Sequence, residues 1–178
     1  GGTLLDRAFF GDRLLCIVAI SLLLSLFFFF GGIGRAAPAF PEDTGEPVID
    51  PGRLAKEEEK QALRDYIVSN RLPVKVVIVG ETAPLSTKDF AERLFEEYGM
   101  SDEQLLLVLA WREKTLAAHP GKDWVDAGID GNVIESKISY YFLPYAAEGS
   151  LMQGTKMFLQ QTVEERRADV GLCPLEEQ

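Results

Sequence analysis

The apolar positions of the chain fall into one long uncharged run, followed by shorter stretches with helical or strand-like spacing. The run covers residues 14–34 and is bracketed by Arg13 and Arg35. A helix over these residues would be roughly 31 Å long, which matches the hydrocarbon thickness of a bilayer. The pattern therefore predicts one N-terminal membrane-spanning helix.

Two interpretations of this leader stay open. Residues 1–37 are either an uncleaved signal anchor or a secretory signal peptide that is removed near the small residues 36–39. The apolar run is longer than the core of a typical signal peptide, which favours the anchor. In both cases everything after Arg35 should be exported. The predicted location is the cell membrane, single-pass, with an extracytoplasmic C-terminal domain.

The next segments predict a linker, a helix and a strand. Residues 38–45 contain prolines, a glycine and acidic side chains, which is typical of an extended linker. Asp50 and Pro51 are placed as the N-cap and first residue of a helix that should extend to about Asn70. Residues 74–79 are mostly β-branched and interrupted only by a lysine, so they predict a buried strand.

The middle of the chain predicts a second helix and a hairpin. Ser86 and Asp89 have the spacing of a capping pair, and Gly99 would end the helix that they begin. Residues 105–110 are all apolar and predict a central strand buried on both faces. After a charged turn, residues 115–119 should pair with this strand in an antiparallel hairpin.

The remaining segments predict a loop and two helices. Residues 121–131 are rich in glycine and aspartate and predict a loop. Apolar residues over 133–145 recur at helical spacing until Pro144 disturbs the turn, with Tyr140 facing water, and a last helix should cover about 150–167. Helices alternating with buried strands indicate the α/β class, here a small mixed β-sheet sandwiched by helices on both faces.

Composition excludes several classes of function. The chain has 18 Lys and Arg against 28 Asp and Glu, for a net charge of −10, so no nucleic-acid partner is expected. The single histidine, His119, cannot supply a His-rich zinc site, and no phosphate-binding glycine loop or nucleophile elbow is present. Cys16 and Cys173 fall in the leader and the tail, which leaves the exported domain without a disulfide.

Carboxylates are the side chains that remain for chemistry. The candidates lie near the ends of predicted elements: Asp50, Asp102, Asp123, Asp126 and Asp130. Hard cations such as calcium bind several oxygens from loop aspartates and backbone carbonyls. Asp50 and Asp130 have a ready explanation as helix caps and Asp102 as the cap of the turn before its strand, so spacing alone favours caps and leaves cation binding open as the second interpretation.

The ordered set of these features resembles the TPM domain family. The features that carry the resemblance are Val48-Ile49-Asp50-Pro51, the strand over 74–80, Asp102 ahead of 105–108, the glycine-led loop 121–130, and Leu143-Pro144-Tyr145 followed by Gly149 and Gly154. The resemblance places a TPM-like domain at residues 46–168 and leaves residues 169–178 as a tail.

The resemblance implies a membrane-attached α/β sandwich that binds membrane proteins and assists the maintenance or assembly of their complexes. It also implies binding of calcium or another divalent cation at clustered aspartates, which correspond here to Asp50, Asp102 and Asp130. The alternative that it implies is a metal-dependent acid phosphatase using the same aspartates, for which no catalytic residue is assigned. The chain departs from the family pattern at Glu103-Gln104, where Asn-Gly is usual, and at Asp123, where a second glycine is usual.

Overall fold

The computed structural model describes residues 39–169 of the chain. The predicted leader at residues 1–37, whether anchor or signal peptide, lies outside the described residues, as does the tail after Asp169. Within 39–169, no helix combines the length and the apolar character that crossing a membrane requires.

Four strands form one mixed sheet in the order β1-β2-β3-β4. β1 (Val48–Ile49) and β3 (Leu105–Ala110) both run parallel to β2 (Val74–Val79), and β4 (Thr115–Pro120) runs antiparallel to β3. The α/β class, the two buried strands and the hairpin are therefore confirmed. The sequence pattern does not predict β1, because a strand of two residues is too short to show any alternation.

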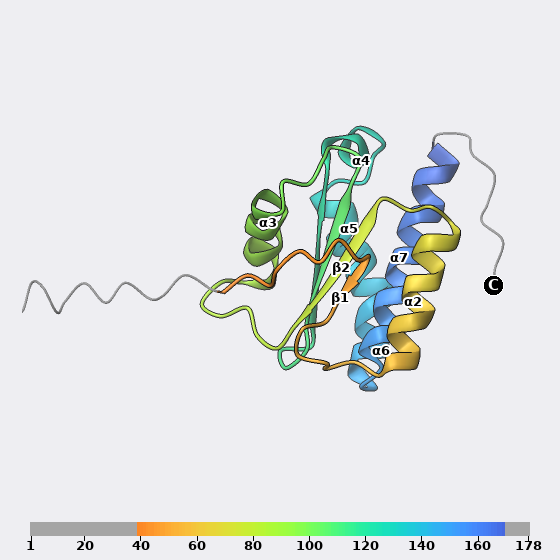
Figure 1. Cartoon of the computed structure of the whole chain (residues 1–178). Coiled ribbons are helices and arrows are strands. Elements are labelled where there is room, and N and C mark those ends of the chain that lie inside the picture. Colours follow the sequence, from red (N-terminus) through yellow and green to blue (C-terminus); the bar gives the residue numbers. More distant parts are fainter. Residues whose placement is uncertain (1–38, 170–178) are drawn as a thin grey trace, which may run out of the picture. The chain divides into compact units, whose positions relative to one another are not determined.

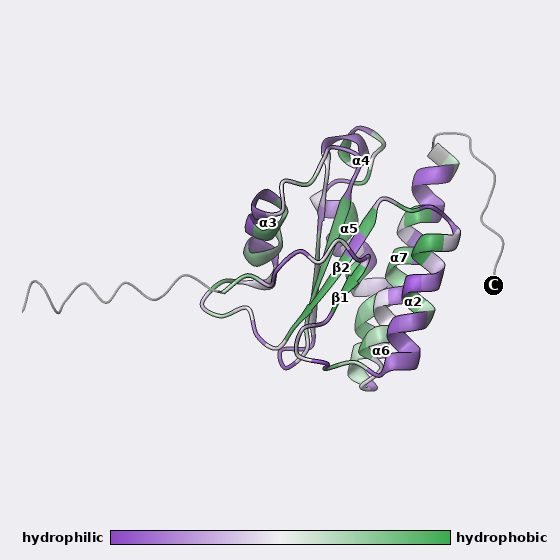
Figure 2. Cartoon of the chain, in the orientation of Figure 1, coloured by the Kyte–Doolittle hydropathy of each residue, from purple (hydrophilic) through white to green (hydrophobic). Residues whose placement is uncertain are grey.

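Helices cover both faces of this sheet (Figure 1). One face packs against α3 (Thr87–Glu97), whose Phe90 and Leu94 are buried there. The other face packs against α2 (Glu57–Ser69) and α7 (Leu151–Asp169), which lie side by side. Each helix presents its apolar side to the strands, and the outer side of α2 is hydrophilic (Figure 2). β3 is completely buried because both of its faces are covered.

α3 has the two ends that the sequence predicts. The Ser86 side chain accepts a hydrogen bond from the backbone N–H of Asp89 at 3.1 Å, which satisfies one of the free amides at the start of the helix. Gly99 follows the last turn with a φ of 60°. Glycine adopts this left-handed conformation without steric cost, so the helix ends here.

The first helix begins later than the sequence predicts. α2 starts at Glu57, with Lys56 in the N-cap position, and Asp50 does not cap it. Residues 50–55 form a turn in which Arg53 has a φ of 49°, a conformation that does not continue a right-handed helix. The acidic residues in the first turn of α2 favour a helix start there, because they interact well with the free amides.

The predicted loop over residues 121–131 contains a short helix, α4 (Lys122–Asp126). Trp124 in this helix is buried, and its Nε1–H donates to the backbone oxygen of Glu103 at 2.7 Å. A tertiary contact of one tryptophan therefore orders a segment whose glycines and aspartates predict a loop.

The long helix predicted after this loop is divided into three parts. They are α5 (Gly131–Lys137), the π-helical turn η1 (Ile138–Phe142) and α6 (Leu143–Ala147). Pro144 does not end the helical segment but stands in the first turn of α6, directly after the π-helical turn. Tyr140 is exposed, as predicted.

Candidate functional site

The carboxylate of Asp50 is almost completely buried in the turn after β1. Its Oδ1 accepts a hydrogen bond from the Leu54 N–H at 3.0 Å, and its Oδ2 accepts one from the Ala55 N–H at 3.1 Å. The side chain is 1% exposed. An ionised carboxylate tolerates such burial only when it is hydrogen-bonded and paired with a cation.

Lys60, in the first turn of α2, supplies this cation. Its Nζ lies 3.2 Å from Oδ2 of Asp50 and 3.0 Å from Oε2 of Glu57. Burial by itself lowers the pKa of Lys60, but the hydrogen bonds and charges of Glu57 and Asp50 outweigh this effect, and the pKa lies above its ordinary value. Lys60 therefore remains a cation and links β1 to α2.

A polar hollow of about 360 Å³ opens beside this pair. Its lining combines three basic with three acidic side chains and Val48: Arg53, Lys60, Arg64, Glu46, Asp50 and Glu57. A metal ion that entered this hollow would compete with the Lys60 ammonium for Oδ2 of Asp50. The arrangement favours a structural use of this carboxylate.

Asp102 lies in the exposed turn before β3. Its backbone oxygen accepts a hydrogen bond from the Asp123 N–H at 3.0 Å. Gly121, just before α4, lies so close to this turn that a Cβ on it would be 2.3 Å from the backbone oxygen of Asp102. Asp102 therefore contacts the α4 segment through its backbone oxygen, and this close approach requires glycine at position 121.

Asp130 caps α5. Its Oδ1 accepts a hydrogen bond from the backbone N–H of Val133 at 2.9 Å, so the interpretation as a helix cap is confirmed. Of the two remaining candidates, both exposed on α4, Asp126 pairs with Lys122 at 2.6 Å. Asp123 uses its backbone N–H in the contact with Asp102.

The three aspartates that the resemblance pairs with a cation do not meet at one edge of the sheet. Asp50 follows β1 at the carboxyl end of the parallel strands, whereas Asp102 precedes β3 at their amino end. Within residues 39–169, no group of three or more His, Cys, Asp or Glu side chains is arranged to hold a metal ion. The expected three-aspartate cluster is thus not formed, and cation binding at any one of these residues stays a prediction.

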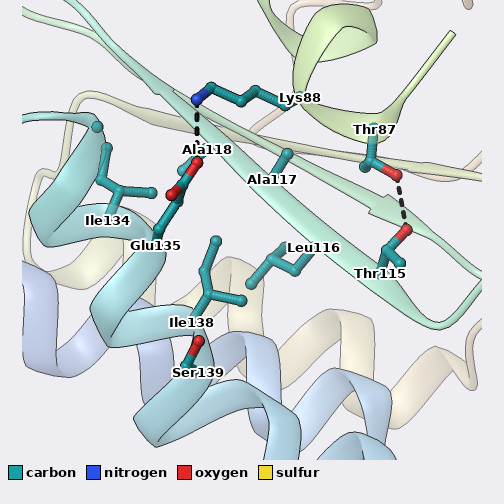
Figure 3. A pocket seen from close by; sticks show the side chains of 11 residues that line it. Thr87, Lys88, Thr115, Leu116, Ala117, Ala118, Ile134, Glu135, Ile138 and Ser139 are labelled. Atoms are coloured by element: carbon teal, nitrogen blue, oxygen red, sulfur yellow. Dashed lines mark hydrogen bonds and ion pairs between the residues drawn. The ribbon is translucent and has the colours of Figure 1, made fainter.

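A second hollow, of about 440 Å³, lies at the outer edge of β4 (Figure 3). Leu116, Ala117 and Ala118 of β4 line it, together with Ile134 and Ile138 of α5 and η1, and the start of α3. Most of this lining is apolar, which is typical of a binding surface. Sequence analysis does not identify it, because three segments far apart in the chain form it.

One ion pair crosses the second hollow. Lys88 of α3 and Glu135 of α5 approach to 3.0 Å between Nζ and Oε1, and both side chains are largely exposed (Figure 3). At the far end of β4, the hydroxyls of Thr87 and Thr115 lie 2.6 Å apart. The remaining lining residues carry no charge.

His119 packs on the face of the sheet that α3 covers. Its ring lies 4.7 Å from that of Phe95, centroid to centroid, and the residue is half-buried. Burial lowers the pKa of His119 below its ordinary value, although Glu92 and Glu96 act in the opposite direction. The contact assigns this histidine to the packing of α3 on the sheet.

These features define an α/β sandwich domain with three parallel strands, one antiparallel edge strand and a buried Asp–Lys pair at the first strand. The chain belongs to the TPM domain family, whose sequence pattern matches residues 48–165. The resemblance seen in the sequence is thereby confirmed.

Three solved structures have the same fold. The N-terminal domain of a protein from P. gingivalis is 16% identical, with a TM-score of 0.58 over 76% of this chain and 90% of that one. The N-terminal domain of the cg2496 protein from Corynebacterium glutamicum is 12% identical, with a TM-score of 0.53 over 79% and 89%. The BA42 protein from Bizionia argentinensis is 16% identical, with a TM-score of 0.56 over 67% and 86%. At these identities the likeness shows the fold alone. No protein of curated function matches the sequence.

Proposed function

We propose that this chain is a membrane-tethered TPM domain that acts as a non-enzymatic binding module and assists the maintenance or assembly of membrane protein complexes. The observation that carries the non-enzymatic part of the proposal is that the carboxylate of Asp50 is already bound by groups of the domain itself. Its carboxylate is buried against two backbone amides and the Lys60 ammonium, so it stabilises the turn between β1 and α2. The tether in the proposal is the uncharged run at residues 14–34.

The hollow at β4 supports a binding role. It is concave and mostly apolar, and one face of α5 and η1 contributes Ile134 and Ile138 to it. Such surfaces bind partners through burial of apolar area. Lys88 and Glu135 are the only ionisable side chains that line it among the described residues, and those two are paired with each other.

Binding of calcium or another divalent cation is part of the proposal. Asp102 and Asp130 have exposed positions in loops, where carboxylate and carbonyl oxygens can approach a hard cation. Because Asp50 lies at the other end of the strands, it does not share a centre with Asp102, and we place any such cation at Asp102 or at Asp130.

A phosphatase is the alternative function. A hydrolytic centre of this kind needs carboxylates that converge on one ion, which polarises a phosphoryl oxygen. Asp50 and Asp102 lie at opposite ends of the parallel strands, so these residues do not offer that geometry. The binding module is therefore the better-supported function.

Crosslinking of the full chain in its native membrane tests the proposal. We expect a recurring set of membrane proteins among the crosslinked products. The proposal would be wrong if no membrane protein recurred. It would also be wrong if the purified chain hydrolysed a generic phosphoester and lost this activity in a folded Asp102→Asn, Asp130→Asn double variant.

A further inference from the structure

β4 presents an unpaired backbone edge. It is the last strand of the sheet, and no strand within residues 39–169 pairs with its outer side. Gly121 N–H donates to the backbone oxygen of Gln104 at 2.8 Å, which fixes the alternation of hydrogen bonds between β3 and β4. Ala117 and His119 therefore bond to β3, and the N–H and C=O groups of Leu116 and Ala118 point outward.

These outward groups have no partner in the described part of the chain. None of its turn, loop or side-chain hydrogen bonds uses the N–H of Leu116 or Ala118. Backbone groups without a partner are uncommon in folded proteins, and those of Leu116 and Ala118 belong to residues that line the hollow. Pro120, which has no N–H, stands at the next outward position, where proline is tolerated in an edge strand.

Apart from Pro120 at its end, this edge lacks the features that usually prevent strand pairing. β4 has six residues, none of them Lys, Arg, Asp or Glu, and its register with β3 continues without a bulge. Edge strands are usually shortened, charged or bulged, because an open edge can pair with another chain. The opposite edge follows that rule, since β1 has only two residues.

The hollow provides room and walls for one additional strand. Ile134 and Ile138 border one side of β4, and the start of α3 with Thr87 and Lys88 borders the other (Figure 3). The side chains of Ala117 and Ala118 are small, which leaves space beside the backbone edge. The exposed pair between Lys88 and Glu135 crosses this space and, like most surface ion pairs, should open readily.

Charge and shape together favour one kind of occupant. Lys88 and Glu135 neutralise each other and the other lining residues are uncharged, so the hollow is suited to an uncharged segment. A second copy would bring its own α3 and α5 against those of the first, which is unfavourable for a strand edge flanked by helices. A single extended peptide has no flanking helices, so it can reach the strand edge without this clash.

We propose that β4 binds an extended, uncharged peptide segment of a partner protein by strand addition. The backbone of the segment would pair with the outward groups of Leu116 and Ala118, and its alternate apolar side chains would pack on Ile134 and Ile138. The inference rests on the proposed binding function and names the chemistry of the partner segment.

Amide hydrogen exchange of the isotope-labelled full chain tests the inference. The probe is a pooled library of end-blocked peptides of roughly ten residues, in which Val, Leu or Ile alternates with Ser or Thr. Without peptide, the Leu116 and Ala118 amides should exchange freely. With peptide, their exchange should slow by about tenfold or more, because new hydrogen bonds protect them.

Two variants and a control decide whether the edge is the binding site. Ala118→Pro removes an outward N–H but no bond between β3 and β4, and should weaken peptide binding about tenfold. Ser139→Trp fills the hollow from its exposed rim and should abolish binding. Ser136→Trp makes the same substitution at an exposed position outside the lining and should leave binding unchanged. If Ala118→Pro does not fold, Ser139→Trp decides.

Several outcomes would overturn the inference. One is that the whole library leaves the exchange rates of the Leu116 and Ala118 amides unchanged. Another is that the peptides protect these amides in the Ser139→Trp variant as strongly as in the wild type. Protection without peptide that grows with protein concentration would assign the edge to a second copy. Protection that disappears on deletion of residues 170–178 would assign it to the chain's own tail. If peptide binding failed while membrane-protein crosslinks persisted, this inference would fall and the proposed function would stand.

Discussion

Lys60 Nζ lies 3.2 Å from Oδ2 of Asp50, and the two side chains are only 8% and 1% exposed. The pair connects the end of β1 with the first turn of α2. It also determines how this acidic residue is used, because two backbone amides and one ammonium already bind its carboxylate.

Lys60→Met should destabilise the domain, because it leaves Asp50 shielded from water without a counter-charge. The pair borders a polar hollow, so we expect less than the full cost of a deeply buried pair, about 2 kcal/mol of unfolding free energy. Urea denaturation measures it. Lys122→Met removes the exposed pair with Asp126 and is the matched control, for which we expect little change. Equal effects of the two substitutions would contradict the structural role of Asp50.

Gly121→Ala should strongly destabilise the domain. The added Cβ would lie 2.3 Å from the backbone oxygen of Asp102, and relief requires a backbone shift that costs about 3 kcal/mol. Gly131→Ala is the control, since nothing lies within 4 Å of its Cβ and alanine is the better helix former. Thermal unfolding of both variants tests this difference. A Gly121→Ala variant as stable as the control would show that the turn before β3 is not tightly packed on α4.

Acidification should destabilise the domain through His119. Burial against Phe95 lowers the pKa of His119, so the unfolded chain takes up its proton first as the pH falls. This contribution to stability is complete above the ordinary pKa of 6.5 and decreases as the pH falls from there through the lowered folded value. The difference in unfolding free energy between wild type and His119→Gln should therefore change with pH below 6.5. A difference that stayed constant from pH 7.5 to 5 would contradict the burial effect.

Calcium should raise the melting temperature of the full chain if a cation binds the folded state, because binding to that state alone stabilises it by mass action. Asp102→Asn and Asp130→Asn should each reduce the shift in part, since the proposal places the cation at single aspartates. The absence of any shift at millimolar calcium or magnesium would remove cation binding from the proposal. Complete loss of the shift in each single variant would indicate a shared centre instead.

Local patterns predict much of this fold. The continuous apolar run at Leu105–Ala110 predicts a strand buried on both faces, and Ser86 and Gly99 predict both ends of α3. These features depend on neighbours in the chain. The left-handed φ of Arg53 and the burial of Trp124 depend on tertiary packing, which is why the start of α2 and the existence of α4 are not predictable from periodicity.

The candidate site is less predictable than the fold. The residue types Asp50, Asp102 and Asp130 suit a cation, but only the parallel pairing of β1, β2 and β3 reveals that Asp50 and Asp102 lie at opposite ends of the strands. The hollow at β4 requires the hairpin, α3 and α5 to be assembled first. The sequence does contain one indication of it, an uncharged strand with two adjacent alanines that ends in proline.

Site-specific photocrosslinking from the hollow in native membranes tests the binding role most directly. A small aliphatic diazirine amino acid at Ser139 lies at the rim of the hollow without filling it as tryptophan would, and the same group at Ser136 lies outside it. We predict that the full chain with the group at Ser139 forms crosslinks to a defined membrane protein and that the chain with the group at Ser136 does not. Equal crosslinking from both positions, or none from Ser139, would contradict the binding role of this surface.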